Sequence, residues 1–216
     1  MNRLIASIVF FSIQLQGCLP KQVVTVWKSE TALPVSYDRV MIAVIMEDGN
    51  DSLRLFLEQY TAAQFFALGY NSVSTMKEYG PGGLRNLSAE STYRALCDSG
   101  IDAVLVVALI DKQLANKKIS GEKYNSEYYY KRIWSYRPRL DQIKSSGPGI
   151  DARFAWESIL FDLGSLEPKS VIQIRNFDQP ADTVGIKSVA DQIVREMRQK
   201  KIIIKRDNRP LLYKAF

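Results

Sequence analysis

The chain has 216 residues, of which 46% are hydrophobic and 24% charged, and its formal net charge at pH 7 is +6. This composition is typical of a globular protein and excludes an extended disordered chain. The sequence contains no histidine. Its absence excludes Ser-His-Asp and Cys-His catalytic arrangements, and every zinc site that needs an imidazole ligand.

Residues 1–17 have the pattern of a secretory signal. A short basic start at Arg3 is followed by an apolar run, Leu4 to Ile13. As a helix, this run would span about 15 Å, whereas the hydrocarbon core of a bilayer is about 30 Å thick. We therefore expect it to be a signal region that is removed and not a membrane span.

Leu15-Gln16-Gly17-Cys18 follows the apolar run. This segment resembles the lipobox of bacterial lipoproteins, in which the cysteine thiol is acylated and becomes the new N-terminus. The resemblance implies cleavage before Cys18 and a palmitate-bearing lipid anchor on that residue. It also implies an outer-membrane location with the domain in the periplasm, where nucleic acid is not a partner.

The remaining chain divides into three parts by composition. Residues 18–37 contain Pro20 and Pro34 and few periodic apolar positions, which predicts a lipidated tether. Residues 38–200 form one α/β domain, and residues 201–216 form a basic C-terminal tail. If Cys18 is lipidated, Cys97 is the only other thiol, so the fold depends on a hydrophobic core and not on a disulfide.

The domain begins with a strand, a helix and a second strand. Val40 to Met46 is a continuous apolar run, which is typical of a strand buried on both faces. A helix follows, ended by Gly69, and Tyr70 to Thr75 is a short strand candidate. The predicted buried face of the helix is Leu53, Phe56, Leu57, Tyr60, Ala63 and Ala67.

A second unit repeats this order. Ser88 caps a helix that Gly100 ends, and we expect Tyr93, Leu96 and Cys97 on its buried face, with Cys97 as a small core residue. Ile101 to Ile110 is the next buried strand. The alternation predicts parallel pairing with right-handed crossovers.

The pattern then changes to longer strands. These are Tyr128 to Tyr136, Ala152 to Leu163 and, after a hairpin loop at Gly164 to Pro168, Val171 to Asn176. A final helix fits Thr183 to Lys200, with an inward stripe of Val184, Val189, Ile193, Val194 and Met197. The predicted fold is a single α/β domain with a mixed sheet, which has a strand-helix-strand-helix-strand start, an antiparallel extension and a C-terminal helix.

This order of parts resembles the small envelope lipoproteins of Gram-negative bacteria. Its local marks are Gly69-Tyr70 after a helix, Gly100-Ile-Asp-Ala-Val-Leu-Val-Val feeding a strand, and Glu157-Ser-Ile-Leu-Phe-Asp162 in a hairpin. The domain of these lipoproteins is similar to the amino-terminal domain of TolB and to the periplasmic domain of the curli-secretion lipoprotein. The resemblance implies fold more than function.

Two features near predicted strand and helix ends are candidates for small-ligand sites. Glu47, Asp48, Asp51 and Asp111 lie at the carboxyl ends of predicted strands, where open α/β sheets bind ligands. The spacing around Asp48 departs from a calcium loop, and a solvated turn explains it, so we expect no metal and no cofactor. Tyr79-Gly-Pro-Gly-Gly83 lacks the spacing of a phosphate loop, which favours a plain connection.

The aromatic stretch from Tyr124 to Tyr136 is the strongest candidate for an interaction surface. On a strand, its two faces both contain aromatic side chains beside basic ones, although a core needs only one face. Packing of one face against the sheet is the competing interpretation. The candidate residues are Tyr128, Tyr129, Tyr130, Lys131, Arg132, Trp134 and Tyr136.

Positive charge is concentrated at the C-terminus, from Arg195 to Lys214. These side chains suit anionic lipid head groups, an acidic partner or a solvated helix end. We expect a non-catalytic, lipid-anchored binding or assembly module, accessory to a secretion or outer-membrane complex, with an envelope protein as partner. The alternatives are an enzyme that uses carboxylates or lysine, and a subunit of a pore-forming oligomer.

Overall fold

The computed structural model describes residues 23–29, 36–46, 51–82, 84, 87–110, 154–176 and 183–206. These ranges form one α/β domain on a six-stranded mixed sheet with strand order β1-β6-β5-β4-β2-β3. The strands are β1 (Val23–Lys28), β2 (Arg39–Ile45), β3 (Asn71–Ser74), β4 (Ala103–Ile110), β5 (Phe154–Asp162) and β6 (Glu167–Asn176). The helices are α2 (Asp51–Ala67), α3 (Thr75–Tyr79), α4 (Ala89–Asp98) and α7 (Thr183–Gln199).

The sheet confirms the predicted fold class. β2 pairs in parallel with both β3 and β4, as the alternation of strands and helices predicts. β4, β5 and β6 then pair antiparallel in chain order. We call the end of the sheet where β2 and β4 begin the amino edge, and the end where they finish the carboxyl edge. The predicted strand Tyr128 to Tyr136 lies outside the described residues.

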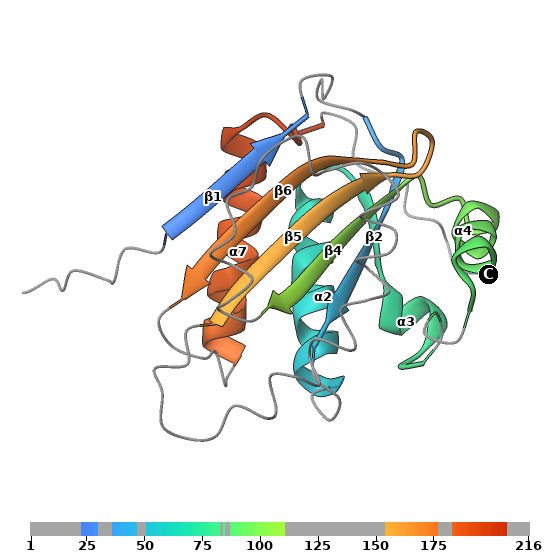
Figure 1. The fold of residues 1–216 in the computed structure, drawn as a ribbon, viewed down its shortest axis with the longest axis horizontal. Helices are drawn as coiled ribbons and strands as arrows, with labels where there is room; N and C mark the ends of the chain where they lie inside the picture. The colour runs from blue at the N-terminus through green and yellow to red at the C-terminus, as the bar shows by residue number, and fades with distance from the viewer. Residues whose placement is uncertain are drawn as a thin grey trace, which may run out of the picture.

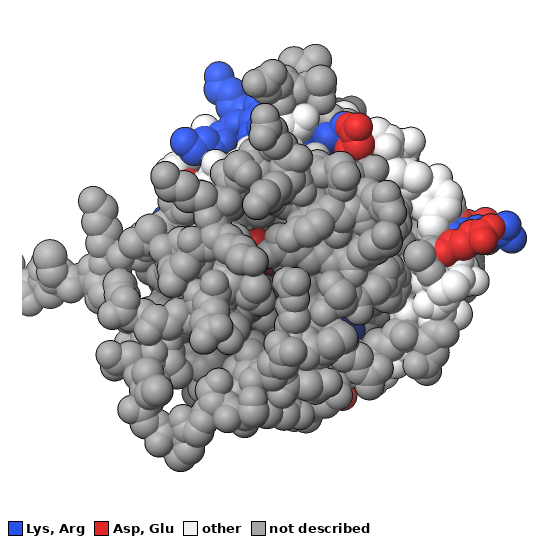
Figure 2. Space-filling model, in the orientation of Figure 1, with Lys and Arg blue, Asp and Glu red and all other residues white. Residues whose placement is uncertain are grey.

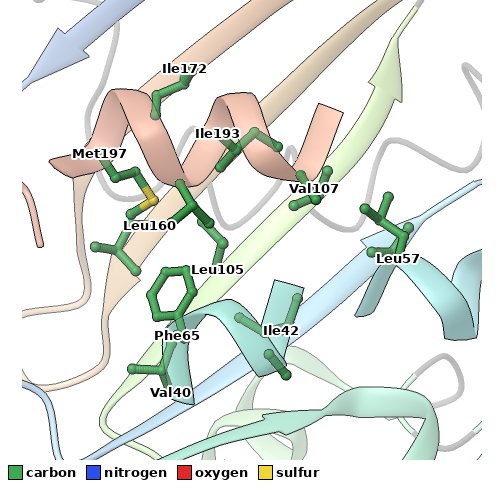
Figure 3. Close-up of a cluster of buried hydrophobic side chains, with 14 of the residues drawn as sticks. Val40, Ile42, Leu57, Phe65, Leu105, Val107, Leu160, Ile172, Ile193 and Met197 are labelled. Carbon is green, nitrogen blue, oxygen red and sulfur yellow. The ribbon is translucent and has the colours of Figure 1, made fainter. Parts of the chain in front are cut away.

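Helices α2 and α7 cover one face of the sheet and pack against each other (Figure 1). Both run from the carboxyl edge back to the amino edge, because each follows a strand that ends at the carboxyl edge. The core between these helices and the sheet is drawn in Figure 3. It includes Val40, Ile42, Leu57, Phe65, Leu105, Val107, Leu160, Ile172, Ile193 and Met197, which all have at most 1% of their surface exposed.

The opposite face of the sheet has a smaller apolar cluster near the amino edge. Leu96 of α4 and Ile101 after it pack against Met41, Val104 and Phe161 from three strands. Successive residues of a strand point to opposite faces, so each central strand contributes to both clusters. This is why β2 and β4 read as unbroken apolar runs in the sequence.

Each of the four described helices is followed by a residue at positive φ, which for α3 is Gly80 at 74°. Gly69 and Gly100 end α2 and α4 at φ values of 92° and 69°, as the sequence predicts. Lys201 does the same after α7 at φ 54°, and the Ile202 N–H donates to the Met197 carbonyl at 2.8 Å. This bond closes the last turn as glycine-ended helices do, although lysine pays the steric cost of the conformation.

The helix faces differ from the predicted ones in three places. On α2 the buried residues are Arg54, Leu57, Glu58, Thr61, Ala62 and Phe65, whereas Ala63 and Ala67 are exposed. Val184 is 73% exposed, because α7 reaches the sheet only from Ile186 onward. Cys97 is exposed and is not a core residue. On α4, Leu96 is buried as predicted and Tyr93 packs partly buried against the same cluster, while Thr92 is a further buried residue.

The segment expected to be a tether contains a strand. Within residues 18–37, β1 pairs antiparallel with β6 along its whole length and is an outermost strand of the sheet. Its sequence, Val-Val-Thr-Val-Trp-Lys, is rich in β-branched residues, which fit a strand. At the other end of the chain, Ile202 and Ile203 are buried in the core, so residues 201–206 also run against the domain.

Candidate functional site

A buried carboxylate lies at the carboxyl edge, where α/β sheets commonly bind ligands. Glu58 is 0% exposed, and its side chain points from α2 toward the ends of β2 and β3. It accepts hydrogen bonds from the Val44 N–H at 3.0 Å, the Ser74 hydroxyl at 2.6 Å and the Met76 N–H at 2.8 Å. Three donors from β2, β3 and the start of α3 therefore converge on one side chain.

Arg54 accompanies this carboxylate one turn earlier on α2. Its Nε lies 3.5 Å from Glu58 Oε1, and the side chain is only 9% exposed. Its Nη1 donates to the Pro81 carbonyl at 3.2 Å. The glycine-rich loop that could have held an anion thus presents a carbonyl to a cation.

The Arg54–Glu58 pair is best explained as a structural connection. The carboxylate accepts three hydrogen bonds from the protein and lies beside a guanidinium, so its oxygens are already engaged within the fold. The pair joins α2 to two strands and to the cap of α3. Of the predicted acidic cluster, Asp51 lies exposed in the first turn of α2, and Glu47, Asp48 and Asp111 lie outside the described residues.

Two further carboxylates, those of Asp102 and Glu157, also accept hydrogen bonds from other parts of the domain. Asp102, at the amino edge, accepts from the backbone N–H groups of Asp38 at 2.6 Å and Arg39 at 3.1 Å. Burial raises the pKa of Asp102, while those two N–H groups oppose the rise. On the sheet face opposite α2 and α7, buried Glu157 accepts from Gln173 Nε2 at 2.6 Å.

Tyr37 adds a buried hydroxyl to the amino edge. It donates to Asp162 Oδ2 at 3.4 Å. Burial raises the pKa of Tyr37 well above its ordinary value, and the negative charge of Asp162 adds to the effect. Its backbone carbonyl accepts a hydrogen bond from Arg206, which also lies 3.3 Å from Asp38 and 5.6 Å from the centre of the Tyr70 ring. Arg206 therefore fixes the C-terminal segment to the domain.

Four exposed cations and the half-buried Lys28 gather beside these anchored groups. We call this surface the basic edge and define it by Lys28, Arg198, Lys200, Lys201 and Lys205. Lys28 Nζ lies 3.5 Å from the Lys200 carbonyl, which brings the end of β1 to the end of α7. Figure 2 shows Lys and Arg gathered at the upper left, over the ends of β1 and α7 in Figure 1.

Exposed apolar side chains accompany the cations at the amino edge. Phe66, near the end of α2, is 46% exposed, and Ile204 is 45% exposed. The segment around Ile204 is held against the end of α2, because the Arg206 N–H donates to the Leu68 carbonyl at 2.8 Å and the Ile204 N–H to the Tyr70 hydroxyl at 3.2 Å. The surface therefore combines positive charge with apolar area on a fixed backbone.

Other predicted site residues lie outside the described parts of the chain. They include the lipidation site Cys18 and the whole aromatic surface, Tyr128, Tyr129, Tyr130, Lys131, Arg132, Trp134 and Tyr136. Within the described residues, no three His, Cys, Asp or Glu side chains are grouped to hold a metal ion. None of the helices in the described ranges has the length and apolar character of a membrane span.

Sequence reasoning missed Arg54, Glu58 and Glu157 as buried polar residues, and the half-buried Asp102 as a partner of the backbone. The spacing of Arg54 and Glu58, four residues apart beside Leu57 and Thr61, was an available signal for the first pair. Asp102 and Glu157 stand next to or within apolar strand sequences. A charged residue at such a position requires a partner when it is buried.

No protein-family model matches this sequence, and no curated protein matches it. Among solved structures, the chain is similar to two PelC dodecamers from Paraburkholderia phytofirmans. The TM-scores are 0.44 and 0.42, and the sequence identity is 12% in both cases. Each alignment covers 86% of this chain and 100% of the PelC chain.

Proposed function

We propose that this chain is an envelope lipoprotein, anchored to the outer membrane by lipid on Cys18, whose α/β domain is a non-catalytic binding or assembly module. In this proposal the protein is an accessory to a secretion or outer-membrane complex. The observation that carries the proposal is the basic edge. It combines cations that form no ion pair with another described residue and exposed apolar side chains on a fixed backbone, which is the composition of a binding surface.

The environment of the carboxylates supports a binding role over a catalytic one. A general base needs a lone pair directed at a substrate proton. The oxygens of Glu58 and Asp102 instead accept hydrogen bonds from the backbone and from Ser74. In these two places the fold uses carboxylates to connect its elements.

The lipid anchor can be tested with the two cysteines of the chain as a matched pair. Cys18→Ser should abolish incorporation of labelled palmitate and shift the full-length protein out of the detergent phase, because each buried CH₂ of the lipid contributes about 0.8 kcal/mol. Cys97→Ser should leave both properties unchanged, since this exposed thiol lies on α4 of the domain.

Two results would contradict the proposed anchor. One is a Cys18→Ser protein that is still labelled by palmitate and still enters the detergent phase. The other is loss of anchoring in the Cys97→Ser variant, which would assign the lipid to the wrong cysteine.

A further inference from the structure

We infer that the basic edge is the docking surface for an acidic envelope protein, on the side of the domain that points away from the anchoring membrane. The direction relative to the membrane rests on the proposed lipid anchor at Cys18. The nature of the partner rests on the charge, the apolar area and the rigidity of the surface itself.

The cations are available for a partner. The side chains of Arg198, Lys200, Lys201 and Lys205 are exposed and form no ion pair within the described parts of the chain. Their backbone is fixed, because Ile202 and Ile203 are buried and Arg206 is bound to Tyr37. A partner therefore does not have to order this segment, which lowers the entropic cost of docking.

A solvated helix end does not account for the whole surface. Cations are favourable near the C-terminus of a helix, and Arg198 and Lys200 fit that role for α7. Lys28 comes from β1, however, and Lys205 lies beyond the end of α7, where the Arg206 N–H donates to the Leu68 carbonyl. Two segments from opposite ends of the chain thus bring positive charge to one edge, and not all of that charge belongs to the helix end.

The apolar side chains favour a protein over a polyanionic glycan or a lipid head group. Phe66 and Ile204 are each almost half exposed at the same edge. Protein interfaces combine apolar contact area with a polar, charged rim, in which the apolar contacts bind and the charges steer the encounter. A glycan carboxylate would bind the cations and leave this area in water.

The path of the chain separates the basic edge from the lipid. β1 begins at the carboxyl edge, since Val23 pairs with Arg175 near the end of β6. The five residue steps from Cys18 to Val23 reach at most about 18 Å when fully extended. β1 then carries the chain a further ~17 Å in the direction of the amino edge, where Lys28 lies. The carboxyl edge is therefore the membrane-proximal end.

The experiment uses the full-length, lipid-anchored protein in the envelope of a Gram-negative host. A photo-crosslinking amino acid replaces Ile204 in one strain and Val184 in a control strain. Val184 is also an exposed apolar residue of the α7 region, but it lies at the opposite, carboxyl edge. We expect position 204 to give a discrete adduct with a protein of acidic isoelectric point and position 184 not to give it.

Charge variants test the chemistry of that adduct. Lys200→Glu, Lys201→Glu and Lys205→Glu together should reduce it by about tenfold or more, and Lys→Gln changes at the same positions should reduce it less. Lys77→Glu, on exposed α3, is the control and should leave it unchanged. In vitro, the full-length protein should bind poly-L-glutamate, and the triple Glu variant should lose this binding.

Two outcomes would overturn the inference. The first is no protein adduct from position 204, or an adduct that the charge variants do not change. The second is salt-sensitive binding of the Cys18→Ser protein to vesicles of phosphatidylethanolamine and phosphatidylglycerol without a protein adduct, which would make lipid the occupant. Failure of the anchor itself appears separately, in the palmitate test, and leaves the crosslinking result interpretable.

Discussion

Removing the carboxylate of Glu58 tests whether the Arg54–Glu58 pair holds the fold together. Glu58→Ala leaves the N–H groups of Val44 and Met76 without their acceptor and leaves Arg54 buried beside no counter-charge. Removing one partner of a buried ion pair costs about 3–5 kcal/mol. For a domain of this size, each kcal/mol lowers Tm by about 2–4 °C, so we expect a fall of about 6–20 °C.

The chain supplies a matched control with the same spacing. Glu90 and Arg94 on α4 are also four residues apart, but their side chains are 74% and 73% exposed. Exposed pairs contribute little to stability, so Glu90→Ala should leave Tm almost unchanged. Arg54→Met should have an intermediate effect, because Glu58 then keeps its three hydrogen bonds.

Urea unfolding of the full-length protein in detergent, followed by far-ultraviolet circular dichroism, measures this order. The expected order of destabilisation is Glu58→Ala, then Arg54→Met, then Glu90→Ala. Equal effects of Glu58→Ala and Glu90→Ala would refute the structural role of the buried pair. A loss of function in Glu58→Ala without any loss of stability would also refute it, because it would indicate a role in ligand chemistry.

Two further predictions concern the amino edge. Because the pKa of Tyr37 is raised, the native state keeps the hydroxyl proton above about pH 10, whereas the unfolded chain loses it. The stability of the wild-type protein should therefore fall in this range. Tyr37→Phe should flatten the fall in Tm between about pH 9 and pH 11. Parallel curves for the two proteins would contradict the assignment. Arg206→Ala should speed trypsin cleavage after Lys200 and Lys201 by about tenfold or more, since hydrogen bonds to a charged group contribute about 1.5–3 kcal/mol. Mass spectrometry measures the cleavage, and an unchanged rate would show that the Arg206 side chain does not hold the segment.

The sequence predicted the parts of the fold that depend on local signals. The strands β2 and β4 appeared as apolar runs, and Ser88, Gly69 and Gly100 marked helix ends that the structure has at those residues. These features are encoded within a few neighbouring residues. A capping hydroxyl or a left-handed glycine acts in any tertiary context.

The parts that sequence reasoning missed depend on distant residues. β1 is a strand because β6 pairs with it from the other end of the chain. The five-residue helix α3 begins at Ser74, and Glu58 on α2 accepts from its Met76 N–H. On α2 the periodicity was correct, but the buried stripe was displaced, since Glu58 occupies a buried position that an apolar count assigns to the surface. On α4 the buried Leu96 was predicted, but the buried Thr92 was missed for the same reason.

The candidate site was predicted only in part. The sequence identified the concentration of positive charge after Arg195, but not its division between exposed cations and the anchored Arg206. It gave no indication that Lys28 or Phe66 lie at the same edge. Composition along a chain reports the charge of a segment, whereas a surface is assembled from several segments by the sheet order.

The pairing of β1 with β6 also determines when the domain can finish folding. Val23 has its partner at Arg175, so the first strand of the sheet has no partner until nearly the whole chain has been synthesised. β2 and β4, by contrast, are separated only by α2, β3, α3 and α4, so they can associate before the second half of the chain is made. Pairings between distant residues form slowly, because a long loop must close before any contact offsets its entropy. The N-terminal strand should therefore dock late, together with β6 and α7, and a chain truncated before residue 167 should leave it as an unpaired edge prone to aggregation.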